Sequence, residues 1–207
     1  PLSSFYKSAE LPYEWTSQLT ARAKEKNIIF LSTPFDLEAV DLLYNAGVPA
    51  FKVASYEMTD DILLRYIARR GKPVILSTGM AYLEEVAHAV DVIKKEGNDQ
   101  VVVLHCVSLY PPQSKDFNLK AMETMHRELG ILVGYSDHAV PSSNAATLGA
   151  ITLGACIIER HITDSQEGGS NDDKNSMTVS QFKQMVREVR DLEAALSGNG
   201  IKEPVSA

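Results

Sequence analysis

The sequence predicts an α/β fold, a (β/α)8 TIM barrel that is present as an incomplete barrel of about six βα units. Short β-branched runs alternate with longer amphipathic stretches until the C-terminal segment begins. The strands are nearly continuous apolar runs, which is typical of parallel strands with both faces of the sheet covered by helices. Six such units in succession indicate a barrel.

The individual elements are predicted from these two patterns. Strands are expected at Ile28 to Ser32, Ala50 to Ala54, Pro73 to Ser77, Val101 to Cys106, Ile131 to Tyr135 and Cys156 to Arg160. Helices are expected at Glu38 to Ala46, Asp60 to Arg70, Leu83 to Glu96, Leu119 to Leu129, Ser143 to Leu153 and Ser180 to Ser197. A further helix is expected to start at Leu11 to Trp15 and to lead into the first strand. Thr59 and Asn118 are expected to cap the helices that follow them.

A complete barrel needs eight strands and typically about 250 residues, so six strands do not close one. We therefore expect residues 1–197 to form a partial catalytic barrel and residues 198–207 to form a linker toward an absent C-terminal domain. A doubly wound parallel sheet of similar length is the structural alternative, although no Gly-rich dinucleotide fingerprint supports it.

Composition restricts the function classes. The chain has 207 residues, of which 44% are hydrophobic and 23% charged, and its formal net charge is -7. No cluster of basic residues with interleaved aromatics indicates nucleic-acid binding, and no apolar run reaches the roughly 20 residues of a membrane span. The protein is expected to be cytoplasmic. Cys106 and Cys156 both lie in predicted strands and are expected to be buried thiols.

The polar residues at the strand ends indicate the chemistry, because barrel enzymes place their sites there. His138 and His161 each follow a buried strand and lie one strand-helix repeat apart. Neutral imidazole is a common ligand of divalent transition metals, so this pair is predicted to bind one. Hydroxyls, glycines and Lys52 recur at the other strand ends, which suits an anionic phosphate or carboxylate. His105, within a strand, is interpreted as a core histidine.

Six ordered motifs resemble the sialic acid (N-acetylneuraminate) synthase family, including pseudaminate and legionaminate synthases. The motifs are Phe30 to Asp36, Phe51 to Glu57, Gly71 to Met80, Leu104 to Cys106 with Tyr110-Pro111, Gly134 to His138, and Ile158 to His161. Their order and spacing agree with the family over nearly the whole chain.

The resemblance implies a TIM-barrel enzyme that condenses phosphoenolpyruvate with an open-chain N-acylated amino sugar, such as N-acetylmannosamine, to a nine-carbon 2-keto acid and phosphate. It implies a divalent metal on His138 and His161, most often Mn²⁺, with Mg²⁺ or Co²⁺ as alternatives. Lys52 joins these histidines as a catalytic residue. The implied phosphoenolpyruvate-binding residues are Thr33, Lys52, Ser55, Ser77, Ser108 and Ser136, and the implied sugar-binding residues are Tyr110 and Asp172.

Departures from the family pattern leave other possibilities open. The segment from Ser170 to Met177 lacks the proline and histidine of the family, so the identity of the sugar is open. Members also carry earlier strands with a catalytic glutamate and a C-terminal antifreeze-like domain that completes a homodimer, and this chain is therefore expected to be inactive alone. The alternatives are an inactive fragment or interaction scaffold, and a Schiff-base pyruvate aldolase that uses Lys52 as nucleophile.

Overall fold

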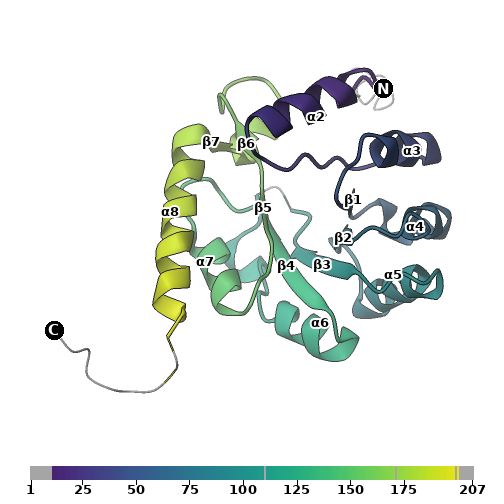
Figure 1. Ribbon diagram of the computed structural model, residues 1–207. Helices are drawn as coiled ribbons and strands as arrows, with labels where there is room; N and C mark the ends of the chain where they lie inside the picture. Colours follow the sequence, from purple (N-terminus) through teal and green to yellow (C-terminus); the bar gives the residue numbers. More distant parts are fainter. Residues whose placement is uncertain (1–10, 110, 171, 199, 201–207) are drawn as a thin grey trace. The chain divides into compact units, whose positions relative to one another are not determined.

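The structure, a computed structural model, describes residues 11–109, 111–170, 172–198 and 200 (Figure 1). The chain forms two compact units, Pro1–Val102 and Val103–Ala207, and strand β3 (Val101–Cys106) runs through the boundary between them. The sheet has the strand order β1-β2-β3-β4-β5. In this sequential order each strand adds beside the previous one, as in a barrel, whereas a doubly wound sheet reverses direction at its switch point. The doubly wound alternative is therefore wrong.

The first unit is built on the parallel pair of strands β1 (Phe51–Val53) and β2 (Val74–Ser77), in which Phe51 lies opposite Val74. Its helices lie side by side in the order α3, α4, α5 in Figure 1. The helices of this unit are α2 (Trp15–Glu25), α3 (Leu37–Asn45), the 3-10 turn η1 (Glu57–Thr59), α4 (Asp61–Ala68) and α5 (Leu83–Lys95).

The second unit is built on the parallel pair of strands β4 (Leu132–Asp137) and β5 (Ile158–Arg160), in which Asp137 lies opposite Arg160. A smaller parallel pair joins β6 (Ile162–Thr163) to β7 (Met177–Thr178). The helices are η2 (Ser114–Asp116), α6 (Ala121–Leu129), α7 (Ala145–Thr152), η3 (Asp173–Asn175) and α8 (Val179–Leu196).

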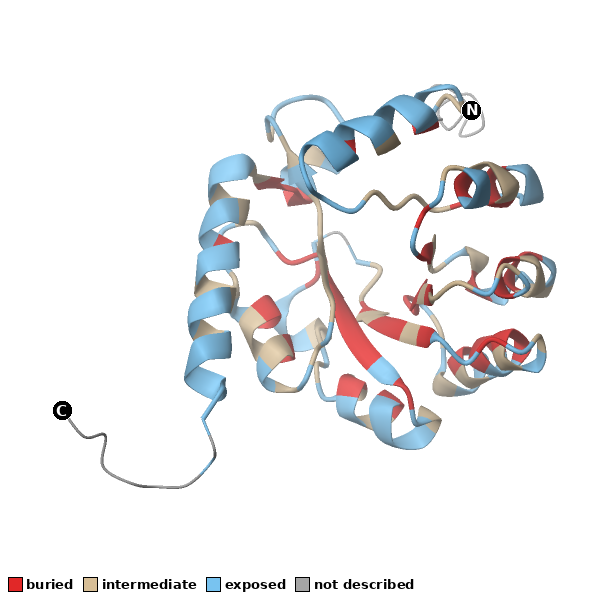
Figure 2. Cartoon of the chain, in the orientation of Figure 1, coloured by how far each residue is buried: buried red, intermediate tan, exposed pale blue. Residues whose placement is uncertain are grey.

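Each unit has its own apolar core, and Figure 2 draws the buried residues in red. In the first unit, α4 turns Leu63, Leu64 and Ile67 inward at helical spacing, and all three are at most 2% exposed. In the second unit, Gly134 lies so close to β5 that an added Cβ would be 2.6 Å from the carbonyl oxygen of Ile157. The side chain of any other residue would push β4 and β5 apart at this point.

Two expectations drawn from apolar runs are wrong. Residues Ile28 to Ser32 do not form a strand, so the sheet has five strands rather than six. Ile28 and Ile29 are 65% and 74% exposed, and a strand forms only where a neighbour supplies a ladder of hydrogen bonds. Cys156 is exposed because it precedes β5 instead of lying within it, whereas Cys106 is buried as expected.

The other elements agree with the predicted ones to within a few residues at each end, apart from the short pair β6 and β7, which the sequence patterns do not predict. The expected linker at residues 198–207 lies almost entirely outside the described residues. Within the described part of the chain, no helix is long and apolar enough to cross a membrane.

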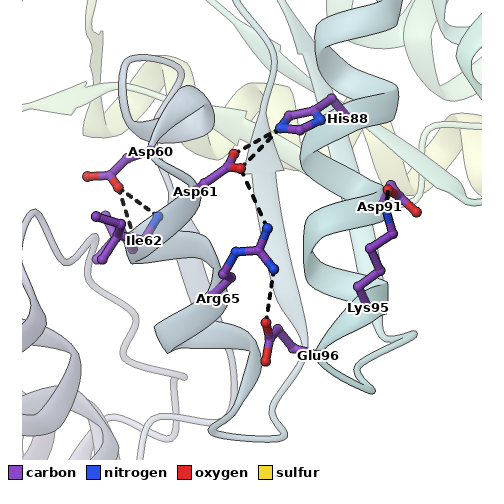
Figure 3. Close-up of polar contacts among 9 residues, drawn as sticks. Asp60, Asp61, Ile62, Arg65, His88, Asp91, Lys95 and Glu96 are labelled. Atoms are coloured by element: carbon purple, nitrogen blue, oxygen red, sulfur yellow. Dashed lines mark hydrogen bonds and ion pairs between the residues drawn. The ribbon is translucent and has the colours of Figure 1, made fainter.

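Neither helix α4 nor helix α6 is capped as expected. Helix α6 begins after Lys120, whose side chain makes no capping bond, and not after Asn118. Helix α4 is capped by a different residue from the expected one. The side chain of Asp60, not Thr59, accepts hydrogen bonds from the backbone N–H groups of Ile62 and Leu63, both at 3.0 Å. Figure 3 shows this cap beside the polar contacts between α4 and α5. There Asp61 pairs with His88 at 3.0 Å, and Arg65 pairs with Glu96 at 3.1 Å.

We predict that Asp60→Ala lowers the free energy of unfolding by about 1 kcal/mol, because two backbone donors at the start of α4 lose their acceptor. The measurement is urea unfolding followed by circular dichroism. Thr59→Ala is the matched control and should leave stability nearly unchanged. A larger loss in Thr59→Ala than in Asp60→Ala would show that the cap is assigned to the wrong residue.

Candidate functional site

Two histidines face each other at the ends of β4 and β5. The ring centroids of His138 and His161 are 5.3 Å apart and their planes are inclined by 52°. Parallel pairing brings them together, because each histidine follows directly after the register-matched residues Asp137 and Arg160. His138 is buried and His161 is partly exposed, so the pair lies at the edge of the second unit.

The ring of His138 is held as a neutral imidazole that can donate a lone pair. Its Nδ1 lies 2.8 Å from the carbonyl oxygen of Val107, which can only accept, so Nδ1 carries the proton and Nε2 is the basic nitrogen. Burial lowers the pKa of His138, and the neighbouring His161 lowers it further. Two imidazole rings whose centroids are 5.3 Å apart could hold one divalent transition metal between them.

The described residues supply no group of three or more His, Cys, Asp or Glu side chains in metal-binding geometry. Among the described residues, His138 and His161 are therefore the two that could hold a metal at this place. Asp172 approaches from the loop after β6, and its Oδ2 lies 4.0 Å from Nδ1 of His161.

Two pairs of polar side chains join β4 and β5 in the residues just before the histidines. The Ser136 hydroxyl donates to Glu159 Oε1 at 2.6 Å and lies 3.5 Å from Nε2 of His138. On the opposite face of the same strands, Arg160 NH1 pairs with Asp137 Oδ1 at 2.9 Å, with both side chains fully buried. Asp137 also accepts the backbone N–H of Ala139 at 2.8 Å, and so shapes the turn that carries His138.

A second cluster lies at the strand ends of the first unit and suits an anion. Lys52, in β1, donates from Nζ to the hydroxyl of Ser77, at the end of β2, at 2.7 Å. Ser55 Oγ accepts the backbone N–H of Gly79 at 2.9 Å, which joins the two following loops. An ammonium group, hydroxyls and the backbone of a glycine-containing turn are the groups that bind phosphate or carboxylate oxygens. Thr33 is half-buried in the extended segment before α3.

Glu57 belongs to this cluster, although the sequence patterns give it no role. Its Oε2 is buried without a hydrogen-bond partner in the described structure, and the charge of Lys52 acts on it. Burial raises the pKa of this carboxyl, and the attraction of Lys52 only partly offsets that effect. A carboxyl with a raised pKa in a cluster of polar side chains is a candidate proton-exchanging group. The sequence feature that could have indicated a role for Glu57 is its position two residues after Ser55.

Three other residues singled out from the sequence lie on or after β3. His105 is the core histidine expected, since its Nε2 lies 2.8 Å from the carbonyl oxygen of Phe117 and burial lowers its pKa. Ser108 is half-buried in the loop after β3. Tyr110 lies outside the described residues.

Known proteins resemble this chain over most of its length. A model of the NeuB family matches residues 1–202. An N,N'-diacetyllegionaminic acid synthase of Campylobacter jejuni is 40% identical over 196 residues, which are 94% of this chain and 58% of that protein. A pseudaminic acid synthase of the same species is 39% identical over 199 residues, or 96% of this chain and 57% of that protein. The chain thus spans a little over half the length of these relatives.

Solved structures give the same picture of the fold. The crystal structure of an N-acetylneuraminic acid (sialic acid) synthetase from Leptospira borgpetersenii superposes with a TM-score of 0.88 at 33% identity, covering 96% of this chain and 68% of that one. A truncated 3-deoxy-D-arabino-heptulosonate 7-phosphate synthase from Thermotoga maritima superposes with a TM-score of 0.78 at 18% identity and supports the fold alone.

We predict that Glu57→Gln stabilises the protein at neutral pH, because it removes a carboxylate whose ionised form is disfavoured by burial. Below the unfolded pKa of about 4.3 the glutamate is protonated in both states and the two proteins should be equally stable. The advantage of the variant should grow as pH rises toward the raised folded pKa and then level off.

The measurement is the difference in unfolding midpoint between variant and wild type from pH 4 to pH 8. Glu84→Gln, an exposed position in the first turn of α5, is the control for a lost surface charge. A variant that is less stable than wild type at pH 8 would contradict the assigned environment of Glu57.

Proposed function

Because the chain belongs to the NeuB family, we propose that the protein condenses phosphoenolpyruvate with an open-chain N-acylated amino sugar to a nine-carbon 2-keto sugar acid. The names of the relatives as legionaminic, pseudaminic and N-acetylneuraminate-9-phosphate synthases support a sugar-acid synthase. The observation that carries the proposal is the facing of His138 and His161 at 5.3 Å from the ends of two adjacent parallel strands.

The reaction consumes one water and releases one phosphate. A carbon–carbon bond forms between C3 of phosphoenolpyruvate and the aldehyde carbon of the sugar. Water adds to C2, its proton leaves, and the resulting hemiketal phosphate loses phosphate by cleavage of the C2–O bond. In the proposal His138 and His161 hold a divalent metal, preferably Mn²⁺, which when bound supplies Lewis acidity toward the sugar aldehyde.

The chain's own residues bind and orient the anion. Lys52 neutralises the phosphoenolpyruvate carboxylate with the help of Thr33, and its bond to Ser77 fixes the direction of the ammonium group. The hydroxyls of Ser55, Ser77, Ser108 and Ser136 are assigned to the phosphate. Binding holds the anion in one orientation before the reaction begins. The entropy cost of bringing two reactants together is then met on binding, so the activation barrier is lower.

The sugar-binding residues are assigned to the second unit. Asp172, which is 4.0 Å from the ring of His161, is suited to accept hydrogen bonds from sugar hydroxyls. Tyr110 is assigned to the sugar by family resemblance alone.

We predict that the full-length protein releases phosphate from phosphoenolpyruvate only when an N-acylated amino sugar such as N-acetylmannosamine and Mn²⁺ are both present. His138→Ala should lower kcat at least about 100-fold, because the metal loses one of its two protein ligands. The measurement is a phosphate-release assay with product identification by mass spectrometry.

His88→Ala is the control, since His88 is an exposed histidine of the first unit that pairs with Asp61. Undiminished turnover by His138→Ala, or activity that persists after complete chelation of metal, would contradict the metal route.

We predict that Lys52→Met weakens phosphoenolpyruvate binding by about 1.5–3 kcal/mol, because a charge-assisted hydrogen bond to the anion is lost. The measurement is calorimetric titration with phosphoenolpyruvate, and Lys95→Met on the exposed face of α5 is the control. Trapping of pyruvate on Lys52 by borohydride would contradict this assignment and show a Schiff-base aldolase instead.

A further inference from the structure

Alternate side chains of β4 and β5 point to opposite faces of the sheet, so the residues around the histidines fall into two groups. In strands, residues two apart share a face, so Ser136 and His138 lie on one face of β4, and Glu159 and His161 on the matching face of β5. Asp137 and Arg160 lie between these positions and point to the other face. There they meet each other and the hydroxyl of Thr147, which comes from α7.

Arg160 binds the backbone on both sides of His138. Its NH1 donates to the carbonyl oxygen of Asp137 at 2.9 Å and its NH2 donates to the carbonyl oxygen of Ala139 at 2.7 Å. The same NH1 pairs with the Asp137 carboxylate at 2.9 Å. The planar guanidinium therefore fixes the turn that carries His138, while its own backbone leads directly into His161.

The carboxylate of Asp137 completes this arrangement from the other strand. One oxygen accepts the N–H of Ala139 at 2.8 Å, and the other accepts the hydroxyl of Thr147 at 2.6 Å. Asp137, Thr147 and the side chain of Arg160 are at most 1% exposed, so water does not compete for these bonds. Apolar side chains of similar size could hold the strands together equally well.

We propose that Arg160 and Asp137 are positioning residues that lock His138 and His161 into the mutual orientation needed to hold one divalent metal ion. This inference rests on the proposed metal role of the histidines. It adds that residues on the opposite face of the strands control the metal affinity. We call Arg160, Asp137 and Thr147 the clamp, which contacts neither the ion nor the substrate.

Two substitutions are expected to remove hydrogen bonds of the clamp while changing little else. In Arg160→Lys the charge stays, but a single ammonium group replaces the fork that reaches the carbonyls of Asp137 and Ala139 together. In Thr147→Val the shape stays, but the hydroxyl that orients Asp137 is removed. Thr147→Ser keeps that hydroxyl and should restore wild-type behaviour.

The experiment titrates Mn²⁺ alone into the purified full-length protein, by calorimetry and by electron paramagnetic resonance of the bound ion. The expected result is a loss of Mn²⁺ affinity of about 10- to 100-fold in Arg160→Lys, the range typical of groups that orient metal ligands. Thr147→Val should show a smaller loss, and Thr147→Ser none. Phosphoenolpyruvate affinity without metal should be unchanged in all three.

Arg70→Lys is the matched control, since Arg70 is a largely buried arginine of the first unit that pairs with Asp41. It should lower the unfolding midpoint without changing Mn²⁺ affinity. If Arg160→Lys does not fold, the contrast between Thr147→Val and Thr147→Ser decides.

Two results would overturn the inference in different ways. Wild-type affinity in both Arg160→Lys and Thr147→Val, with lowered unfolding midpoints, would show that the clamp only stabilises the fold, and the proposed function would stand. Failure of the wild-type protein to bind Mn²⁺ would remove the metal role itself and this inference with it.

Discussion

The ion pair between Asp137 and Arg160 has no solvent-exposed side-chain surface and joins the ends of β4 and β5, on which the proposed metal site depends. Removing two charges from water costs free energy that a buried pair only just recovers, so such a pair is a poor means of stabilising a sheet. Burial lowers the pKa of Arg160, while the Asp137 carboxylate acts in the opposite direction. The pair does, however, give two strand ends one defined relative position. Those are the strand ends that carry His138 and His161.

The two clusters at the strand ends use opposite electrostatics. In the first unit, Lys52 brings a positive charge and hydrogen-bonded hydroxyls, which suit an anion. In the second unit, burial lowers the pKa of His138, and the bond from its Nδ1 to the carbonyl oxygen of Val107 leaves Nε2 as the lone-pair donor, which suits a cation. A condensation between a phosphorylated enol acid and an aldehyde needs both environments, since one reactant is anionic and the other must be made electrophilic.

Much of this could be predicted from the sequence, because continuous apolar runs locate buried strands and the 3.6-residue period locates helices. The apolar run at Ile28 failed as a strand because strand formation depends on a neighbour, which a single segment does not report. The histidine pair could be predicted from the sequence because each histidine directly follows a strand, and the two strands belong to successive strand-helix repeats. Glu57, the clamp of Arg160 on the turn of His138, and the contact from Thr147 were not, because each depends on register and on packing between elements.

The most direct measurement is an anomalous difference map, collected at the manganese absorption edge from crystals of the full-length protein grown with Mn²⁺. We expect one peak in the second unit, bound by Nε2 of His138 and by a ring nitrogen of His161, with Arg160 still bonded to the carbonyls of Asp137 and Ala139. No peak between these two rings, or a peak held only by surface carboxylates, would contradict it.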